Sequence, residues 1–174
     1  MRTRQKERDT PGPSEPWNEV FPGLWMGGHY YTPPGGELEP AVVRGEFDLV
    51  VSLFTLPGHG PEPRVEHLVR EVPDDRLSAA QLLAVQEAAE LTTSAVRRGR
   101  RTLVRCHSGY NRSGLVAAQA LVGLGHDPAG AIRVVRERRS PWALNNPVFV
   151  EYLNTGLDVA ILLTGLNEPD RSAG

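Results

Sequence analysis

The sequence predicts an α/β fold in which a central, mostly parallel sheet is flanked by helices. Two observations support this fold class. Residues 47–53 form a compact apolar run typical of a buried strand, and residues 101–105 form a second short run that is also predicted to be a strand. The second of these runs lies between longer segments with helical periodicity, and strands followed by interleaved helices are typical of a sheet covered by helices.

The composition is that of one soluble domain of ordinary size. A chain of 174 residues can bury a core without disulfides or a structural metal, and a formal net charge of −2 argues against a general nucleic-acid-binding protein. With a single cysteine no intramolecular disulfide is possible, so the chain needs no oxidising compartment. The charged stretch Met1–Asp9 is not a secretory signal, and no later run approaches a membrane span. We therefore expect a cytoplasmic monomer with no membrane partner.

The folded domain is expected to occupy residues 17–165. Residues 1–16 combine mixed charge with three prolines and are predicted to form a disordered tail, because they bury too little apolar surface to offset the entropy of ordering. Residues 166–174 are predicted to be a flexible tail.

The first half of the domain is predicted to hold strands joined by loops. A short strand is expected at 24–26, followed by a loop over 30–40 and then by the buried strand at 47–53. Glycine and proline make 55–63 an irregular connection, and weak alternation predicts another strand at 65–72.

The second half is predicted to be mostly helical. Ser78 and Gln81 form a capping box that starts the first helix, and Gly99 lies where its C-terminal cap belongs. After the strand at 101–105, helices are predicted over 112–124, from Asp127-Pro128 to about Arg139, and from Asn146-Pro147 toward Leu163.

The loop from Cys106 to Ser113 indicates the chemistry of the chain, since it joins a strand to a helix. At such a junction several backbone N–H groups and the positive end of the helix dipole converge on one point. That setting favours the thiolate, so Cys106 can act as a nucleophile without a dedicated base. Gly109 can adopt the backbone angles that turn the amides inward, and Arg112 can bind two phosphoryl oxygens bidentately. Ser113 is placed to hydrogen-bond the thiolate.

This loop, with its central glycine and an arginine six places after the cysteine, resembles that of the protein-tyrosine phosphatase superfamily, and specifically its small dual-specificity branch. Residues 20–27 are similar to the opening strand of that branch. The Val-Pro-Asp sequence at 72–74 resembles its general-acid loop. The resemblance covers roughly residues 17–155.

The resemblance implies a cysteine-dependent phosphatase that hydrolyses phosphotyrosine, and also phosphoserine or phosphothreonine, in proteins. The implied mechanism passes through a phosphocysteine on Cys106, with Arg112 as phosphate clamp and an aspartic acid as proton donor. It needs no metal or organic cofactor, and the implied partners are phosphorylated proteins or other phosphomonoesters rather than a specific nucleic acid. The phosphate cradle would be formed by His107, Ser108, Gly109, Tyr110, Asn111 and Arg112.

Two positions depart from the family pattern. Arg105 stands where the family usually has a histidine that supports the loop, and a histidine follows the cysteine instead, at His107. The acid is ambiguous because Asp74 and Asp75 are adjacent. Asp74 is the preferred candidate, since it follows a proline as the family's acid does, and Asp75 is the reserve. A proline followed by two aspartates is also common in turns, so this segment could simply be a turn before the helix cap at Ser78.

Other polar side chains are assigned structural roles or none. Four arginines of the helix at 127–139 are predicted to lie on a solvated face: Arg133, Arg136, Arg138 and Arg139. Four histidines lack metal-ligand spacing and receive no role: His29, His59, His67 and His126. Asn145 and Asn146 are expected to cap a helix. Tyr30 and Tyr31 either line the pocket or pack in the core.

Four other functions use a similar arrangement. RNA 5′-triphosphatases and phosphoinositide phosphatases share this loop, and residues 109–114 are similar to the loop of the RNA type, whereas the loop lacks the paired lysines that often mark inositide-directed members. A catalytically silent phospho-binding module would use the cradle without turnover. A sulfurtransferase of the rhodanese type also places a cysteine at a strand–helix junction, but Arg112-Ser113 and the upstream Pro-Asp argue against it.

Overall fold

A five-stranded sheet with the order β1-β2-β7-β5-β6 forms the base of the structure, a computed structural model that describes residues 10–169. Its strands are β1 (Trp17–Phe21), β2 (Leu24–Gly27), β5 (Leu49–Ser52), β6 (Glu66–Val69) and β7 (Thr102–Arg105). All neighbours are parallel except β1, which pairs antiparallel with β2. The predicted mostly parallel sheet is therefore confirmed.

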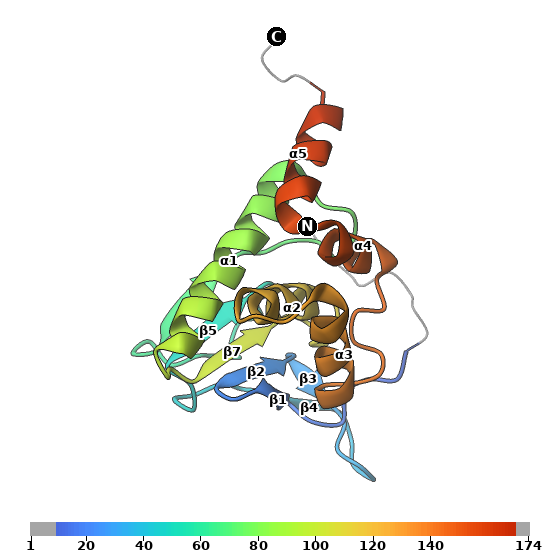
Figure 1. The fold of residues 1–174 in the computed structure, drawn as a ribbon. Helices are drawn as coiled ribbons and strands as arrows, with labels where there is room; N and C mark the ends of the chain where they lie inside the picture. The colour runs from blue at the N-terminus through green and yellow to red at the C-terminus, as the bar shows by residue number, and fades with distance from the viewer. Residues whose placement is uncertain (1–9, 170–174) are drawn as a thin grey trace.

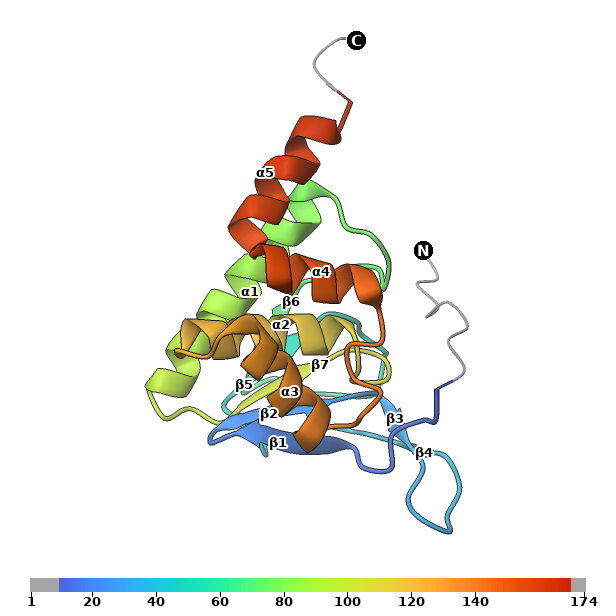
Figure 2. The ribbon, with the colours of Figure 1, turned by 45° about the vertical axis from the view of Figure 1, so that its right-hand side comes forward.

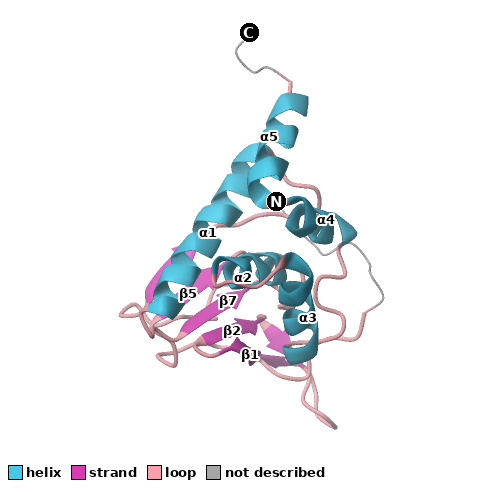
Figure 3. Cartoon of the chain, in the orientation of Figure 1, coloured by secondary structure: helices cyan, strands magenta, loops and turns pink. Residues whose placement is uncertain are grey.

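The helices lie on one side of this sheet (Figures 1 and 2). They are α1 (Ala79–Arg97), α2 (Arg112–Gly123), α3 (Pro128–Arg138), α4 (Pro147–Thr155) and α5 (Leu157–Asn167). Figure 3 shows α2 over the middle of the sheet and α5 pointing away from it. The α/β fold class is confirmed, with the refinement that the helices cover one face.

Loop residues cover the other face of the sheet. Strand side chains alternate between two hydrophobic clusters, as the pleat requires. The helix-side cluster includes Leu24, Met26, Leu49, Val51 and Val104. The opposite cluster joins Val50 and Leu103 to Val43 and Phe47, which precede β5, and to the partly buried Trp25. Segments without regular structure thus complete the core on that side.

The helix starts follow the predicted capping chemistry. Ser78 Oγ accepts the Gln81 N–H at 3.1 Å, and Gln81 Oε1 accepts the Ser78 N–H at 2.9 Å, which completes the capping box of α1. Asp127 and Asn146 cap α3 and α4 with their side chains. Gly99 follows the C-terminal end of α1 with a φ of 73°, as expected for a helix-ending glycine.

The predicted last helix, over 146–163, is instead two helices. α4 and α5 meet at Gly156 and are bent by 111°. Gly156 has a φ of 94°, a conformation that ends a helix and that residues with a side chain rarely adopt. α5 then continues to Asn167, past the predicted domain boundary at 165. Within the described range, no single helix is long and apolar enough to cross a bilayer.

Short strands occur where the sequence predicted none. β1 is an edge strand of mixed polarity, so its sequence carries little of the apolar signal of a buried strand. β3 (Tyr30–Tyr31) pairs with β4 (Glu39–Pro40) at the base of the segment predicted as a loop.

Residues 10–16 differ from the predicted disordered tail. The carbonyl oxygens of Pro13 and Pro16 accept backbone hydrogen bonds from Thr32 at 2.9 Å and Gly28 at 3.2 Å. The carbonyl oxygen of Pro11 accepts a hydrogen bond from a tyrosine hydroxyl of the folded domain. These contacts with distant residues order a segment whose own composition would not. Residues 1–9 and 170–174 of the predicted tails lie outside the described residues.

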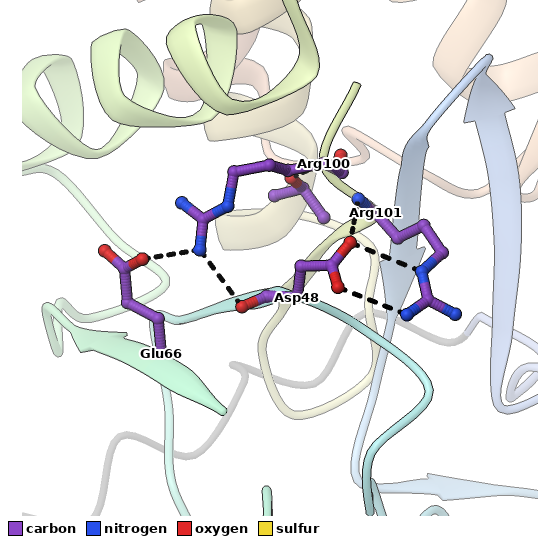
Figure 4. Close-up of polar contacts among 5 residues, drawn as sticks. Asp48, Glu66, Arg100 and Arg101 are labelled. Carbon is purple, nitrogen blue, oxygen red and sulfur yellow. Dashed lines mark hydrogen bonds and ion pairs between the residues drawn. The ribbon is translucent and has the colours of Figure 1, made fainter. Parts of the chain in front are cut away.

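An exposed ion-pair network joins three strands at the amino ends of the parallel strands (Figure 4). Arg101 binds Asp48 through both its backbone N–H and its guanidinium, and these contacts hold the pKa of Asp48 below its ordinary value. Arg100 Nη2 lies 2.6 Å from Glu66 Oε2 and 3.2 Å from the Asp48 carbonyl oxygen. Exposed pairs of this kind contribute little to stability, because water screens them. This edge is remote from the carboxyl ends of the strands, where the candidate site lies.

Candidate active site

Cys106 lies at the carboxyl end of β7, where the chain turns through the loop 106–111 into α2. Its side chain is 2% exposed, and its backbone N–H donates to the Gly27 carbonyl of the neighbouring strand at 3.3 Å. Cys106 Sγ lies 3.3 Å from Ser113 Oγ in the first turn of α2. A buried thiol at a helix N-terminus, next to a hydroxyl, is the geometry expected from the sequence.

Four consecutive carbonyl oxygens of this loop accept hydrogen bonds from outside it. The His29 N–H donates to the His107 carbonyl oxygen at 2.8 Å, and the Leu144 N–H donates to that of Tyr110 at 3.0 Å. Between them, the Arg139 guanidinium donates to the carbonyl oxygens of Ser108 at 3.0 Å and Gly109 at 3.2 Å. A trans peptide points its N–H group away from its C=O group. The N–H groups of residues 108–111 therefore face the inside of the loop, and together they form a cradle for an anion.

Gly109 is required at the centre of this cradle for two reasons. Its φ is 78°, a conformation that residues with a side chain rarely adopt. A Cβ atom at this position would lie 2.6 Å from both the Arg139 guanidinium and the Gly27 carbonyl group. The loop can close only because nothing projects from this residue.

Arg112 begins α2 and is 2% exposed. Its Nη1 donates to the Val72 carbonyl oxygen at 3.2 Å, and its Cζ lies 5.1 Å from the ring centroid of Phe54. The guanidinium is thus held between the segment that contains the candidate acids and an aromatic ring. Held in this way, it is fixed beside the loop as a phosphate clamp requires.

Arg139 corrects the prediction that the arginines of α3 lie on a solvated face. Its guanidinium is buried and binds the loop carbonyls of Ser108 and Gly109. It also donates to the Glu15 carbonyl oxygen at 2.9 Å and to Asn18 Oδ1 at 2.7 Å. Burial lowers the pKa of Arg139, and negative charge on Tyr110 and on Cys106 acts in the opposite direction. The buried guanidinium therefore holds the loop in shape.

Replacing Arg139 with methionine should lower the turnover number for an aryl phosphate by roughly 10²-fold, the cost of a misplaced catalytic loop. Methionine keeps an apolar stem but leaves two loop carbonyls without their donor, so the free energy of unfolding should also fall by about 2–4 kcal/mol. Steady-state kinetics and thermal melting test both effects. The exposed Arg133, on the same helix, is the matched control as Arg133→Met. Equal kinetics for the two variants would contradict this role of Arg139.

Arg105 replaces the histidine of the family pattern and points away from the phosphate loop. Its guanidinium donates to Ser52 Oγ at 2.9 Å and to the carbonyl oxygens of His59 at 2.9 Å and Gly60 at 2.5 Å. Burial lowers its pKa to about 10, so it stays charged at neutral pH. Arg105 therefore fixes the segment after β5 rather than the loop itself.

His29 and His59, to which the sequence assigned no role, join His107 in a ring cluster beside the loop. The ring centroids of His29 and His59 are 5.0 Å apart, and the His107 ring lies 5.3 Å from that of Phe54. Tyr30 contacts the rings of both His59 and His107, at 5.1 and 6.0 Å. Tyr30, Phe54 and His107 are only partly buried, so this cluster forms an aromatic wall next to Arg112.

Protein stability is expected to fall as the pH is lowered from about 6.5 to about 4, because of His29. Burial lowers the pKa of His29 to about 4, while its hydrogen bond to the Phe54 carbonyl opposes this shift and the charge of Arg105 adds to it. Between these values the unfolded chain binds a proton that the folded chain excludes, so acid favours unfolding. Denaturant titrations at several pH values in this range should show that the free energy of unfolding depends less steeply on pH in His29→Asn than in wild type. The same pH dependence in both proteins would exclude His29 as the cause.

Asp74 and Asp75 lie in different surroundings. Asp74 is buried, with Oδ2 3.0 Å from Asn111 Nδ2 and Oδ1 2.9 Å from Asn146 Nδ2. Asp75 is exposed, and its Oδ1 accepts the Arg76 N–H at 2.8 Å. The structure thus brings the Val-Pro-Asp segment against the phosphate loop.

The sequence did not predict that Arg139 binds the phosphate loop or that Asn111 and Asn146 bind Asp74. Only the position of Arg139 has a signal in the sequence. It follows Val135 by four residues, so it continues the buried stripe of α3 rather than its exposed face. The contacts of Asn111 and Asn146 with Asp74 join residues far apart in the chain, which no local pattern reveals.

The whole structure is similar to those of known phosphatases. Human DUSP28 is 26% identical, with a TM-score of 0.64 over 87% of this chain and 99% of that chain. A mouse putative dual specificity phosphatase, solved with zinc tungstate, is 24% identical, with a TM-score of 0.55 over 91% of this chain and 97% of that chain. OH1 from the Orf virus, a tyrosine phosphatase, is 16% identical, with a TM-score of 0.58 over 83% of this chain and 87% of that chain. By sequence, no family model and no curated protein matches the chain.

The fold is that of the dual-specificity and tyrosine phosphatases, as the loop resemblance implied. Together with the cysteine loop, this likeness supports a place for the chain in the dual-specificity branch of the protein-tyrosine phosphatase superfamily.

Proposed function

We propose that the chain is a cysteine-dependent phosphatase that hydrolyses phosphomonoesters through a phosphocysteine intermediate. One observation carries this proposal. The four loop carbonyl groups point outward and accept hydrogen bonds from residues outside the loop, so the loop N–H groups point inward above the buried Cys106 thiol. An arginine stands at the rim of the same loop. This combination supplies a nucleophile, an oxyanion cradle and a clamp in one place.

Two displacements at phosphorus complete the reaction. Cys106 Sγ attacks phosphorus as the bond to the leaving oxygen breaks, and an acid of the 74–75 segment gives that oxygen a proton. Water then attacks the phosphocysteine, the P–S bond breaks, and the carboxylate takes a proton from the water. The Ser113 hydroxyl, 3.3 Å from the sulfur, can donate a hydrogen bond to the departing thiolate. Arg112 and the loop amides bind the phosphoryl oxygens in both steps.

Phosphotyrosine in proteins is the proposed first substrate, with phosphoserine and phosphothreonine as further ones. The aromatic wall of Tyr30, Phe54 and His107 supports this order, because it places ring surfaces beside Arg112 and the loop. An aryl leaving group can pack on such a wall, whereas an alkyl one buries less apolar surface there. The similar solved structures, which are dual-specificity and tyrosine phosphatases, also support it.

The test is a substrate panel for the full-length chain. It comprises a phosphotyrosyl peptide, a phosphoseryl peptide, a soluble inositol phosphate and an RNA 5′-triphosphate. The proposal expects the highest kcat/KM on the phosphotyrosyl peptide. A preference for RNA triphosphate or the inositol phosphate would replace the proposed substrate, and phosphate binding without any hydrolysis would leave a phospho-binding module.

A further inference from the structure

Helix α5 is apolar on both of its faces. Its inner face holds the buried Leu157 and Ala160, on the side where α5 lies along α1. Its outer face carries four more apolar side chains at helical spacing, between 46% and 81% exposed, which form an outer stripe: Val159, Leu162, Leu163 and Leu166. A helix that is apolar all round is normally buried on every side, whereas α5 points away from the sheet with this stripe open to water (Figure 3).

An apolar side chain of α1 extends the outer stripe. Leu83 is 46% exposed and shares a side of α1 with Ala79 and Gln86, which hydrogen-bond Glu168 and Asp158 at the two ends of α5. Five of the eight large apolar side chains that are exposed in the described part of the chain therefore lie on α5 or beside it. Together they leave on the order of 500 Å² of apolar surface in water, at the upper end of what a monomeric protein shows in one patch.

The outer stripe carries no charge. The acidic side chains at the two ends of α5 are turned toward α1, where Asp158 accepts a hydrogen bond from the Gln86 amide and Glu168 accepts one from the Ala79 N–H at 2.7 Å. From residue 147 to residue 167 the sequence has no lysine or arginine. A helix that lies on a lipid surface typically has basic residues beside its apolar face, so the composition argues against a membrane. An uncharged apolar surface of a protein is the better match.

The spacing of the outer stripe is the same in both chain directions. From Val159 the intervals are three, one and three residues, and from Leu166 they are again three, one and three. A second copy of α5 that lies antiparallel therefore places Val159 opposite Leu166 and Leu162 opposite Leu163. A two-fold symmetric dimer requires such self-complementary contacts, in which residue i meets j and j meets i. The pair would bury about 1,000 Å² in all, the lower limit for a specific interface.

We infer that the outer stripe of α5 is an interface that pairs two copies of this chain in antiparallel orientation. The dimer replaces the monomer expected from the composition. Its small area makes it weak, so half of the protein should be dimeric at roughly 10–100 µM. The interface contains no residue of the phosphate loop or of the 72–75 segment, so the inference is independent of the proposed function.

Sedimentation equilibrium of the full-length chain between roughly 1 and 500 µM tests the inference. Wild type should shift from monomer to dimer over this range. Leu162→Glu should stay monomeric throughout, because a dimer would bury two carboxylates without partners. Leu38→Glu should dimerise as wild type does, since it changes a leucine of matched exposure, 67% against 68%, in the loop between β3 and β4. An unchanged Tm in Leu162→Glu shows that its fold is kept.

A pair of opposite charges tests the antiparallel geometry. Val159→Lys and Leu166→Glu should each weaken the dimer alone, and their equimolar mixture should form heterodimers, because position 159 of one copy meets position 166 of the other. A mixture that stays monomeric would exclude this geometry. Wild type that is monomeric at the highest concentration, or Leu162→Glu that dimerises as wild type does, would overturn the inference. Binding of monomeric wild type, but not of Leu162→Glu, to phosphatidylcholine vesicles would assign the outer stripe to a membrane instead.

Discussion

Replacing Cys106 with serine is expected to lower the turnover number for aryl phosphates by at least about 10⁴-fold. The thiol lies at the base of the loop, 2% exposed, below amide groups that face the inside of the loop. A serine hydroxyl at the same place ionises far less readily, so it cannot attack phosphorus at a useful rate. No other cysteine exists in the chain to substitute for it.

The Cys106→Ser variant should still bind an oxyanion, because the cradle and Arg112 remain. Binding of phosphate, followed by calorimetry, and an unchanged Tm are the controls that separate loss of the nucleophile from loss of the fold. Residual hydrolysis within about tenfold of wild type would show that a different group performs the chemistry.

Arg112→Lys is expected to lower the turnover number by about 10³–10⁵-fold, the range measured when an arginine that stabilises a transferring phosphoryl group is lost. Lysine keeps the charge, but it lacks the planar fork that binds two phosphoryl oxygens at once. It also gives up the guanidinium contacts with the Val72 carbonyl and the Phe54 ring. Most of the loss should therefore appear in kcat, with a smaller rise in KM.

Arg98→Lys is the matched control for this prediction, since Arg98 is exposed beyond the end of α1. Its kinetics should equal those of wild type. If Arg112→Lys and Arg98→Lys behaved alike, the clamp would have to be sought elsewhere.

Local chemistry explains how much of the fold the sequence could predict. The capping box at Ser78 and the caps at Asp127 and Asn146 involve residues a few positions apart, so they are visible in the sequence and are found in the structure. The same holds for the cysteine loop, where four residues carry the pattern: Cys106, Gly109, Arg112 and Ser113. The break at Gly156 was missed because apolar periodicity runs through it, although its φ of 94° ends the helix.

Long-range contacts explain what the sequence could not predict in the site. Arg139 reaches loop carbonyls about thirty positions earlier, and its partner Glu15 lies in a segment whose composition predicts disorder. Asn111 and Asn146 reach Asp74 only because the fold brings these distant residues together. Tertiary packing sets the direction of each side chain in this segment, so Asp74 is buried whereas its neighbour Asp75 is exposed.

The most direct test of the central claim is rapid acid quenching of the protein during turnover of a phosphotyrosyl peptide, followed by mass spectrometry of its proteolytic fragments. The predicted result is one phosphoryl group on the fragment that contains Cys106, with none in Cys106→Ser. A protein that turns over the peptide while Cys106 carries no phosphoryl group, or that carries it on another residue, would contradict the proposed mechanism.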